Sequence, residues 1–328
     1  MKRYILGTLI VLSSACGATS VTPVTPAPTG PSPLPASLRV QVSENGVLVV
    51  RQVPLDEYVR ATAISEFAPA VGQIDAVERM LEVQAVISRT YAVSHLGRHA
   101  KDGFDLCSTT HCQLYEPRRL QTSRWAAAST AAVERTSGQV LFFDRQPIQA
   151  LFHADCGGYT STSSAVWGGI DRPYLVARPD DGVASGAHAD WRYEVLVDAL
   201  GAALSSDPRT RLDGTIDSIE VISRDGAGRA ERVAVRSRID RGPADTSVDV
   251  RGDDLRQVLS RAFGARTIRS TKFEVRRTGG LFTFSGRGFG HGVGLCQAGA
   301  FARLNAGATP ADVLHHYYPG AILTRGGL

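Results

Sequence analysis

Glu66 is the residue in this sequence best placed for acid–base chemistry. It lies between Ile64 and Phe67, and no lysine or arginine occurs within five residues on either side. A carboxylate in such surroundings loses hydration without gaining a local cation, which raises its pKa and suits it to protonate a leaving group near neutral pH. The alternative is an ordinary solvated carboxylate at a helix end.

Cysteine and histidine residues form a second chemically competent group. Cys107 and Cys112 are separated by four residues, with His95, His99 and His111 nearby in the sequence. Two thiolates and an imidazole are a common ligand set for zinc, and Cys107, Cys112 and His99 are the candidate metal ligands. A disulfide between the two cysteines is the competing outcome, and it is the commoner one outside the cytoplasm; two free thiols are the third alternative.

Two helices must position Glu66. Apolar residues recur at three-to-four spacing after Pro54, which predicts a helix over 54–66 that cannot continue through Pro69. A similar stripe predicts a second helix over 75–96, with Asp75 as its cap. Glu66 is therefore expected at the C-terminal end of the first helix.

The rest of the chain mixes strands and helices. Alternating apolar residues predict a hairpin over 37–53. Further strands are predicted at 140–143, 148–153, 216–221, 231–235, 246–250, 273–275 and 281–284, and helices at 122–136, from 252 and from 297. This mixture predicts the α+β class.

The N-terminal residues predict export. Lys2 and Arg3 precede an apolar run that ends before Cys16, which is the pattern of an export signal over 1–16 and too short to span a bilayer. Either Cys16 is lipidated or the signal is cleaved in the ordinary way. Residues 17–37 contain six prolines and no charged residue, which predicts an extended linker. We therefore expect the protein in the cell envelope or periplasm, lipid-anchored or secreted.

Composition narrows the classes of function. The chain has 328 residues, of which 43% are hydrophobic and 21% charged, values typical of a globular protein with a full core. The net charge of +4 is small and dispersed, so nucleic acid is not an expected partner.

Three stretches of sequence resemble the stage II sporulation protein D family (SpoIID/LytB). The first runs VPLDEYV from Val53 and closes with QAVISRTYA, and Glu66 falls on the motif glutamate. The second, HADCGGYT from His153, is similar to the family pattern YHSxxGGxT. The third, GRGFGHGVGLCQAGA from Gly286, is similar to GxGFGHGVGxSQxGA, and YYPG at 317–320 is similar to the closing LxHYYPG. The motifs occur in the family's order.

The resemblance implies a single SpoIID-like domain over 38–328, with two lobes around a glycan-binding groove and the helices 54–66 and 75–96 at its centre. It also implies a lytic transglycosylase of peptidoglycan glycan strands, including peptide-stripped ones, or a module that activates a cell-wall amidase. Ordinary glycosidases need two carboxylates. In a lytic transglycosylase the 6-hydroxyl of muramic acid attacks, so Glu66 alone would suffice as acid and then base.

The resemblance assigns substrate contacts to further motif residues. The candidates are Arg89, Tyr91, His153, Gly157, Gly158, Thr160, His291 and Gln297. The alternative for each is a structural role on a helix face or in a glycine-rich loop. Asp155, the nearest thing to a second motif carboxylate, is expected to be a local cap.

Cys156 and Cys296 stand where the family pattern has serine. Because both flank the expected cleft, we predict that they approach each other and could bond. A thiol peptidase that pairs Cys156 with His153, or Cys296 with His291, is a competing hypothesis, which an oxidising compartment disfavours.

The expected partners and cofactors follow from these assignments. Glycan strands and a cell-wall amidase are the expected partners, and only a lipid on Cys16 would contact the membrane. The transglycosylase reaction requires no cofactor, and zinc at Cys107 and Cys112 would be structural.

Overall fold

The computed structural model describes residues 34–69, 72–180, 190–239 and 246–326. The predicted export signal and nearly all of the predicted linker lie outside the described residues. The described chain combines helices with several small sheets, so the mixed α and β content is confirmed. Among the described helices, none is long and apolar enough to cross a membrane.

The predicted hairpin opens the fold. β1 (Ser37–Glu44) and β2 (Val47–Pro54) pair antiparallel, with Glu44 opposite Val47. Asn45 and Gly46 form the turn with φ values of 51° and 81°, a conformation that Asn-Gly favours because it matches the twist of the strands. β3 (Leu106–Cys107) pairs with β1 in parallel. It thereby fixes the start of the loop over 107–117, which contains both Cys107 and Cys112 and is called the cysteine loop here.

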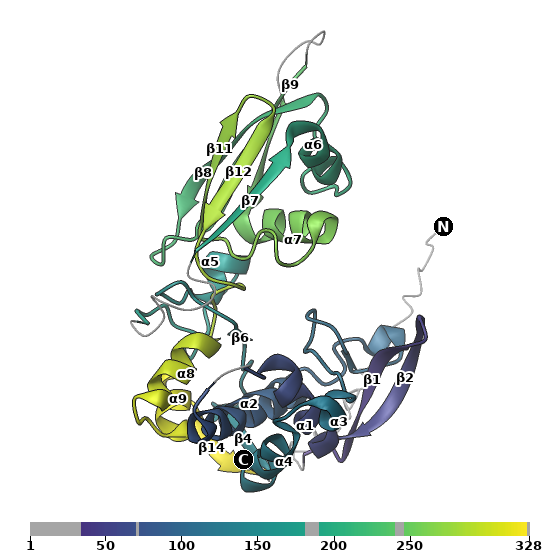
Figure 1. Ribbon diagram of the computed structural model, residues 1–328, viewed down its shortest axis with the longest axis vertical. Coiled ribbons are helices and arrows are strands. Elements are labelled where there is room, and N and C mark those ends of the chain that lie inside the picture. The colour runs from purple at the N-terminus through teal and green to yellow at the C-terminus, as the bar shows by residue number, and fades with distance from the viewer. Residues whose placement is uncertain (1–33, 70–71, 181–189, 240–245, 327–328) are drawn as a thin grey trace, which may run out of the picture.

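Two helices lie at the centre of the main body, a name used here for the described residues of 34–180 and 287–326 (Figure 1). α1 (Leu55–Glu66) follows Pro54 directly and ends at Glu66, as predicted. α2 (Ile74–Ser94) ends two residues before its predicted end. The prediction that Asp75 caps α2 is wrong, because Gln73 occupies that position. Asp75 lies in the first turn instead, where its carboxylate interacts favourably with the helix dipole and pairs with Arg79.

The helix predicted over 122–136 begins four residues later than expected, and a separate short helix precedes it. α3 (Arg119–Thr122) and α4 (Ala126–Arg135) are separated by a short break that contains Trp125. The Trp125 side chain is buried, and its Nε1–H donates to the Pro69 carbonyl oxygen at 2.9 Å. The break therefore ties the segment that follows Glu66 to α4.

Short strands and helices complete the main body. The sheet elements are β4 (Gln139–Phe143), β5 (Gln146–Pro147), β6 (Phe152–His153), β13 (Leu295–Cys296) and β14 (Ile322–Arg325). The helices are η1 (Ala100–Asp102), α5 (Ser163–Trp167), α8 (Gln297–Asn305) and α9 (Pro310–Tyr317). β6 and β13 pair in parallel. The strand predicted over 148–153 is wrong except at its end, because Ile148 and Ala150 are buried in the core without forming a ladder.

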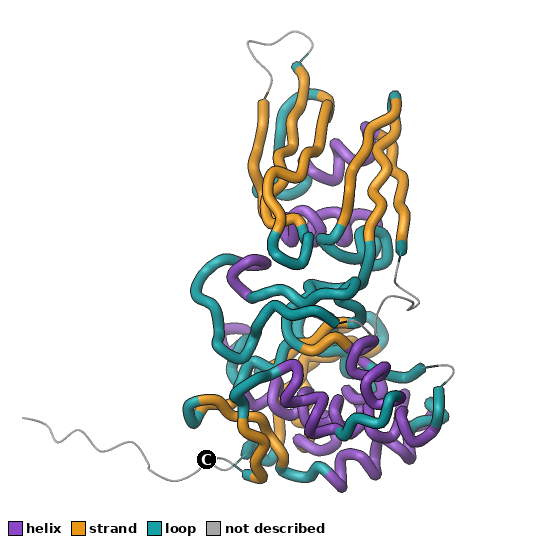
Figure 2. Tube along the Cα trace, turned by 90° about the vertical axis from the view of Figure 1, so that its left-hand side faces the viewer, coloured by secondary structure: helices purple, strands orange, loops and turns teal. Residues whose placement is uncertain are grey.

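Residues 191–286 form a distinct part of the fold, called the insert here, which rises from the main body in Figure 1. Its elements are β7 (Trp191–Leu196), α6 (Val197–Ser205), β8 (Thr215–Arg224), β9 (Ala230–Arg238), β10 (Thr246–Arg251), α7 (Gly252–Phe263), β11 (Phe273–Thr278) and β12 (Leu281–Gly286). The strands form two sheets, in the orders β10-β9-β8 and β11-β12-β7. Figure 2 shows most long strands in the insert and most helices in the main body.

The insert and the main body have separate hydrophobic cores. One cluster of buried apolar residues, which includes Leu200, Val233 and Phe282, lies wholly within the insert. The clusters around α1 and α2 lie wholly within the main body. The strands predicted at 216–221, 231–235 and 246–250 are confirmed, whereas β7 and α6 have no counterpart in the prediction. Two lobes around a groove stay a prediction.

Candidate active site

Glu66 lies partly buried at the end of α1, where the cysteine loop, α2 and α8 meet. The backbone N–H of Leu114 donates to Glu66 Oε1 at 2.6 Å. Burial, opposed by that N–H and reinforced by the nearby Glu116 carboxylate, raises the pKa of Glu66 to about 7. The carboxyl group can therefore hold or release a proton near neutral pH.

Two glutamines fix the backbone of Glu66. Gln297, the first residue of α8, donates from Nε2 to the Glu66 carbonyl oxygen at 3.3 Å and to Gln84 Oε1 at 3.0 Å. Gln84 is fully buried on α2 and donates to Ser88 Oγ at 3.2 Å. These amide hydrogen bonds join the end of α1 to two other helices. The structure therefore brings together two residues of the predicted site, Glu66 and Gln297.

The loop that supplies the Leu114 N–H is lined by metal-ligand side chains. His99, Cys107, His111 and Cys112 each offer one ligand atom, and the four atoms lie within 4.8 Å of one another. His99 Nε2 is 3.4 Å from Cys112 Sγ, and His111 Nδ1 is 3.6 Å from Cys107 Sγ. Ligand atoms of a tetrahedral zinc site with bonds of about 2.0–2.3 Å lie about 3.5 Å apart. The four residues therefore fit zinc.

The structure separates the histidines that the sequence places near these cysteines. His111 joins His99 as a fourth candidate ligand. His95 instead stacks on Tyr91, with ring centroids 4.0 Å apart. Asp102 Oδ2 lies 3.7 Å from His99 Nδ1, the kind of outer contact that zinc-bound histidines commonly have. Both cysteines are free thiols in the structure.

His153 and His291 form a neighbouring group, with ring centroids 5.4 Å apart. Val293 holds both rings, because its carbonyl oxygen lies 3.2 Å from His153 Nδ1 and its N–H donates to His291 Nδ1 at 3.1 Å. The Trp167 ring lies next to the His291 ring, with ring centroids 5.1 Å apart. Burial lowers the pKa of His153 far below its usual value and that of His291 to about 4, so both are neutral at pH 7.

Arg89 and Tyr91 are held within the fold. Arg89 is fully buried and donates to the carbonyl oxygens of Thr136 at 3.0 Å and Gln139 at 3.3 Å. Tyr91 is buried beneath His95, and burial raises its pKa to about 12. All the hydrogen bonds of Arg89 in the structure are made to the protein itself, as a structural role of this residue predicts.

Internal hydrogen bonds also hold the loop around Gly157 and Gly158. Asp155 Oδ1 accepts the Gly157 N–H at 2.7 Å, so Asp155 is a local cap as expected. The Gly158 carbonyl oxygen accepts the Asp180 N–H at 3.0 Å, and Thr160 Oγ1 donates to a backbone carbonyl at 3.1 Å. Both glycines have positive φ, which explains the residue type without a ligand.

Cys156 and Cys296 approach each other, as predicted. The Cys156 N–H donates to Cys296 Sγ at 3.2 Å, and both residues are fully buried free thiols. Because both residues are fully buried, the thiol-peptidase hypothesis lacks a nucleophile that substrate can reach.

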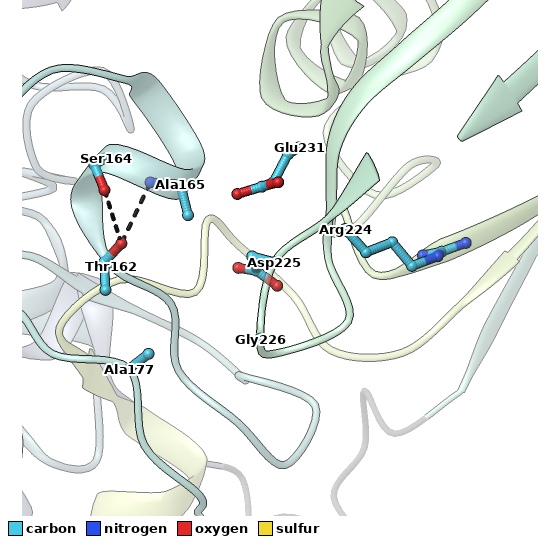
Figure 3. Close-up of a pocket in the computed structure, with 8 residues that line it drawn as sticks. All are labelled: Thr162, Ser164, Ala165, Ala177, Arg224, Asp225, Gly226 and Glu231. Atoms are coloured by element: carbon cyan, nitrogen blue, oxygen red, sulfur yellow. Dashed lines mark hydrogen bonds between the residues drawn. The ribbon is translucent and has the colours of Figure 1, made fainter. Parts of the chain in front are cut away.

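A cavity of about 400 Å³ lies where the insert meets the main body (Figure 3). Thr162 and Ser164 line one side, and Asp225 and Glu231 of the β8–β9 region line the other, while the Arg224 side chain points away. Glu66 is not among the lining residues. Cavity size therefore does not mark the position of the acid.

The sequence interpretation missed Leu114 and Gln84. Leu114 contributes a backbone N–H, for which no side-chain pattern exists. Gln84 interrupts the apolar stripe of α2, and a buried amide on such a face needs a partner. That polar residue is the signal that could have identified it.

Two stretches of the chain match models of known protein families. Residues 43–143 match the model of the family described as stage II sporulation protein. Residues 43–143 therefore form a domain of the SpoIID family, and the resemblance to that family is confirmed for this part of the chain. Residues 187–294 match a second family, described as a domain of unknown function, and this range encloses the insert.

Individual relatives align with most of this chain. Stage II sporulation protein D of Bacillus subtilis (strain 168) is 29% identical over 309 residues, which cover 90% of this chain and 82% of that protein. The protein of the same name from Bacillus amyloliquefaciens is 27% identical, with coverage of 83% and 74%. The amidase enhancer of Bacillus subtilis (strain 168) is 28% identical over 74% of this chain and 38% of that protein.

Proposed function

We propose that this protein is exported and is a lytic transglycosylase that cleaves MurNAc–GlcNAc bonds of peptidoglycan glycan strands, including peptide-stripped ones, with a 1,6-anhydro product. The observation that carries the proposal is the Glu66 carboxyl group, whose pKa of about 7 and fixed backbone suit proton transfer at a leaving group. The SpoIID-family domain supports a role in the bacterial cell wall.

Glu66 would act first as an acid and then as a base. The protonated carboxyl donates to the glycosidic oxygen, and the resulting carboxylate accepts the proton of the muramic acid 6-hydroxyl as that oxygen attacks C1. The Leu114 N–H at Oε1 stabilises the carboxylate and leaves Oε2 for the substrate. Glu116, the carboxylate that acts on the pKa of Glu66, pairs with Arg119 at 2.5 Å, so it is not assigned a nucleophilic role.

The proposal includes a structural zinc ion at His99, Cys107, His111 and Cys112. Zinc bound there supplies cross-linking of the loop rather than a chemical step. The loop residues themselves present the Leu114 N–H to Glu66.

A non-catalytic activator of a cell-wall amidase is the second candidate. The similarity to the amidase enhancer over 74% of this chain favours it. Such a module would bind the same glycan strands, but Glu66 would be dispensable.

Product analysis separates the two candidates. Residues 34–328, as wild type, Glu66→Gln and the matched control Glu116→Gln, are incubated with peptide-free glycan strands, and the products are analysed by mass spectrometry. We expect wild type and Glu116→Gln to give products about 18 Da lighter than hydrolytic fragments, and Glu66→Gln to be slower by at least about 10²-fold.

A different result would replace the proposal. If all three proteins bind the strands without cleavage and all three stimulate an amidase equally, the activator function holds. Hydrolytic products without the mass difference would instead identify an ordinary glycosidase.

A further inference from the structure

We propose that His153, Cys156 and Cys296 form a second, fully buried binding site for a thiophilic divalent cation, with zinc as its natural occupant. One nitrogen and two sulfur atoms of these residues lie within 4.8 Å of one another. His153 and Cys296 stand opposite each other on the paired strands β6 and β13, and Cys156 follows His153 by three residues. The site is separate from the His99–Cys112 cluster and does not depend on the proposed function.

His153 presents a nitrogen that lacks a partner. The Val293 carbonyl oxygen lies 3.2 Å from Nδ1, which places the proton on Nδ1 and leaves the lone pair on Nε2. Nε2 is buried and has no hydrogen-bond partner within the described chain, and only 5% of the residue is exposed. A buried nitrogen without a partner is unfavourable. A cation at Nε2 removes this cost, and Nδ1–H bonded to a carbonyl is the usual outer contact of a metal-bound histidine.

The sulfur atoms have the surroundings of thiolate ligands rather than of a disulfide. Cys296 Sγ accepts the N–H of Cys156 at 3.2 Å and the N–H of Gly299 at 3.4 Å. Backbone N–H groups stabilise negative charge on sulfur, whereas a disulfide sulfur carries no charge for them to stabilise. A disulfide would also leave His153 Nε2 without a partner.

The charges around the site favour a divalent cation. Two buried charged residues lie beside it: Asp180 pairs with Arg303 at 3.1 Å, and burial lowers the pKa of Arg229 while the Asp225 carboxylate opposes that effect. Two thiolates then require two positive charges, which zinc supplies and a monovalent ion does not. Asp180 Oδ2 lies 3.6 Å from Cys156 Sγ and is the candidate for the fourth position of a tetrahedral site.

An ion bound here would cross-link the two segments of the main body that precede and follow the insert in the sequence. His153 and Cys156 precede the insert, and Cys296 follows it. The next residue, Gln297, donates to the Glu66 carbonyl oxygen. The cation would therefore stabilise both the base of the insert and the support of Glu66.

Zinc stoichiometry in paired variants tests the proposal. Residues 34–328 are purified without oxygen, reconstituted with zinc, freed of loosely bound metal and analysed by inductively coupled plasma mass spectrometry. In a Cys107→Ser/Cys112→Ser background, which lacks the other cluster, we expect about one zinc per chain. Adding Cys156→Ser and Cys296→Ser should remove it, and His153→Gln should weaken zinc binding at least about tenfold.

Two results would overturn the proposal. The first is a folded Cys107→Ser/Cys112→Ser protein that retains no zinc. The second is a non-reduced chain about 2 Da lighter than the reduced one, with Cys156 and Cys296 resistant to alkylation, since that identifies a disulfide. If the background variant does not fold, wild type is compared with Cys156→Ser/Cys296→Ser. The proposal then requires a loss of about one equivalent of zinc, and equal zinc contents contradict it.

Discussion

The Glu66 carboxyl makes the stability of the folded state depend on pH. Burial raises its pKa from 4.5 to about 7, so the folded chain binds this proton more tightly than the unfolded chain does. The resulting stabilisation is fully present below about pH 4.5 and is lost as the pH rises through about 7, by at most about 3 kcal/mol. Glu66→Gln, which is neutral throughout, should match wild type near pH 4.5 and be more stable at pH 8.

Denaturant unfolding at both pH values measures this difference. Glu116→Gln is the matched comparison, because it removes a neighbouring negative charge and keeps the Glu66 carboxyl; the pH dependence should persist and shift to a slightly lower pH. Parallel pH dependences for wild type and Glu66→Gln would show that the Glu66 carboxyl is ionised in the folded state with its ordinary pKa.

Arg89 tests whether a motif residue serves the substrate or the fold. Its guanidinium donates to two backbone carbonyls and lies 3.4 Å from Asp56 Oδ1. Arg89→Met should lower the free energy of unfolding by about 2–4 kcal/mol, because buried carbonyls lose their donor, with unchanged kcat/KM per folded molecule. Arg192→Met, which removes an exposed pair with Glu194, should cost less than about 1 kcal/mol. A drop in kcat/KM at unchanged stability would assign Arg89 to the substrate.

At the scale of elements, the cysteine loop links the proposed zinc site to the acid. Cys112 and Leu114 are two residues apart, and the Leu114 N–H lowers the pKa of Glu66. Removal of zinc, or Cys112→Ser, should loosen this contact and raise the pKa above about 7. The pH at which cleavage is lost on the alkaline side, where Glu66 must still be protonated, should therefore move upward.

The pH–rate profile before and after chelation measures this shift, with zinc added back as the control. A fall in rate at every pH without movement of the alkaline limb would mean that the loop supports the fold alone. Glu66→Gln is compared in the same way before and after chelation, with substrate binding measured in place of cleavage. The pH dependence of binding should not shift.

The elements near Glu66 were predictable because their signals are local. Pro54 and Pro69 delimit α1, and Asn45-Gly46 sets the hairpin turn within a few residues. The strand expected over 148–153 fails because Ile148 and Ala150 are buried by α2 and the C-terminal helices, and burial produces the same apolar pattern as a strand. The contacts that shape the site join residues distant in sequence, such as Gln297 with Glu66, and no local pattern encodes them.

At the scale of the whole molecule, the insert is anchored to the main body by buried polar contacts. Arg229, which follows β8, donates to the carbonyl oxygens of Cys156 at 2.8 Å and Gly290 at 3.2 Å. Lys272 Nζ donates to the Gly157 carbonyl oxygen at 3.0 Å, and Trp167 Nε1–H donates to Asp253 Oδ2 at 3.0 Å. The two separate cores are thus coupled through hydrogen bonds that only the assembled protein can form.

This arrangement predicts how the protein unfolds. We expect one calorimetric transition for wild type, because unfolding of either part breaks the buried hydrogen bonds that Arg229 makes across the boundary. Arg229→Met removes the coupling and should separate the transition into two, with the insert melting at its own temperature. Arg232→Met is the control, since Arg232 donates to Asp249 within the insert, and it should preserve a single transition. Two transitions in wild type would show that the insert folds independently of the main body, because the polar contacts would then be too weak to couple the two cores.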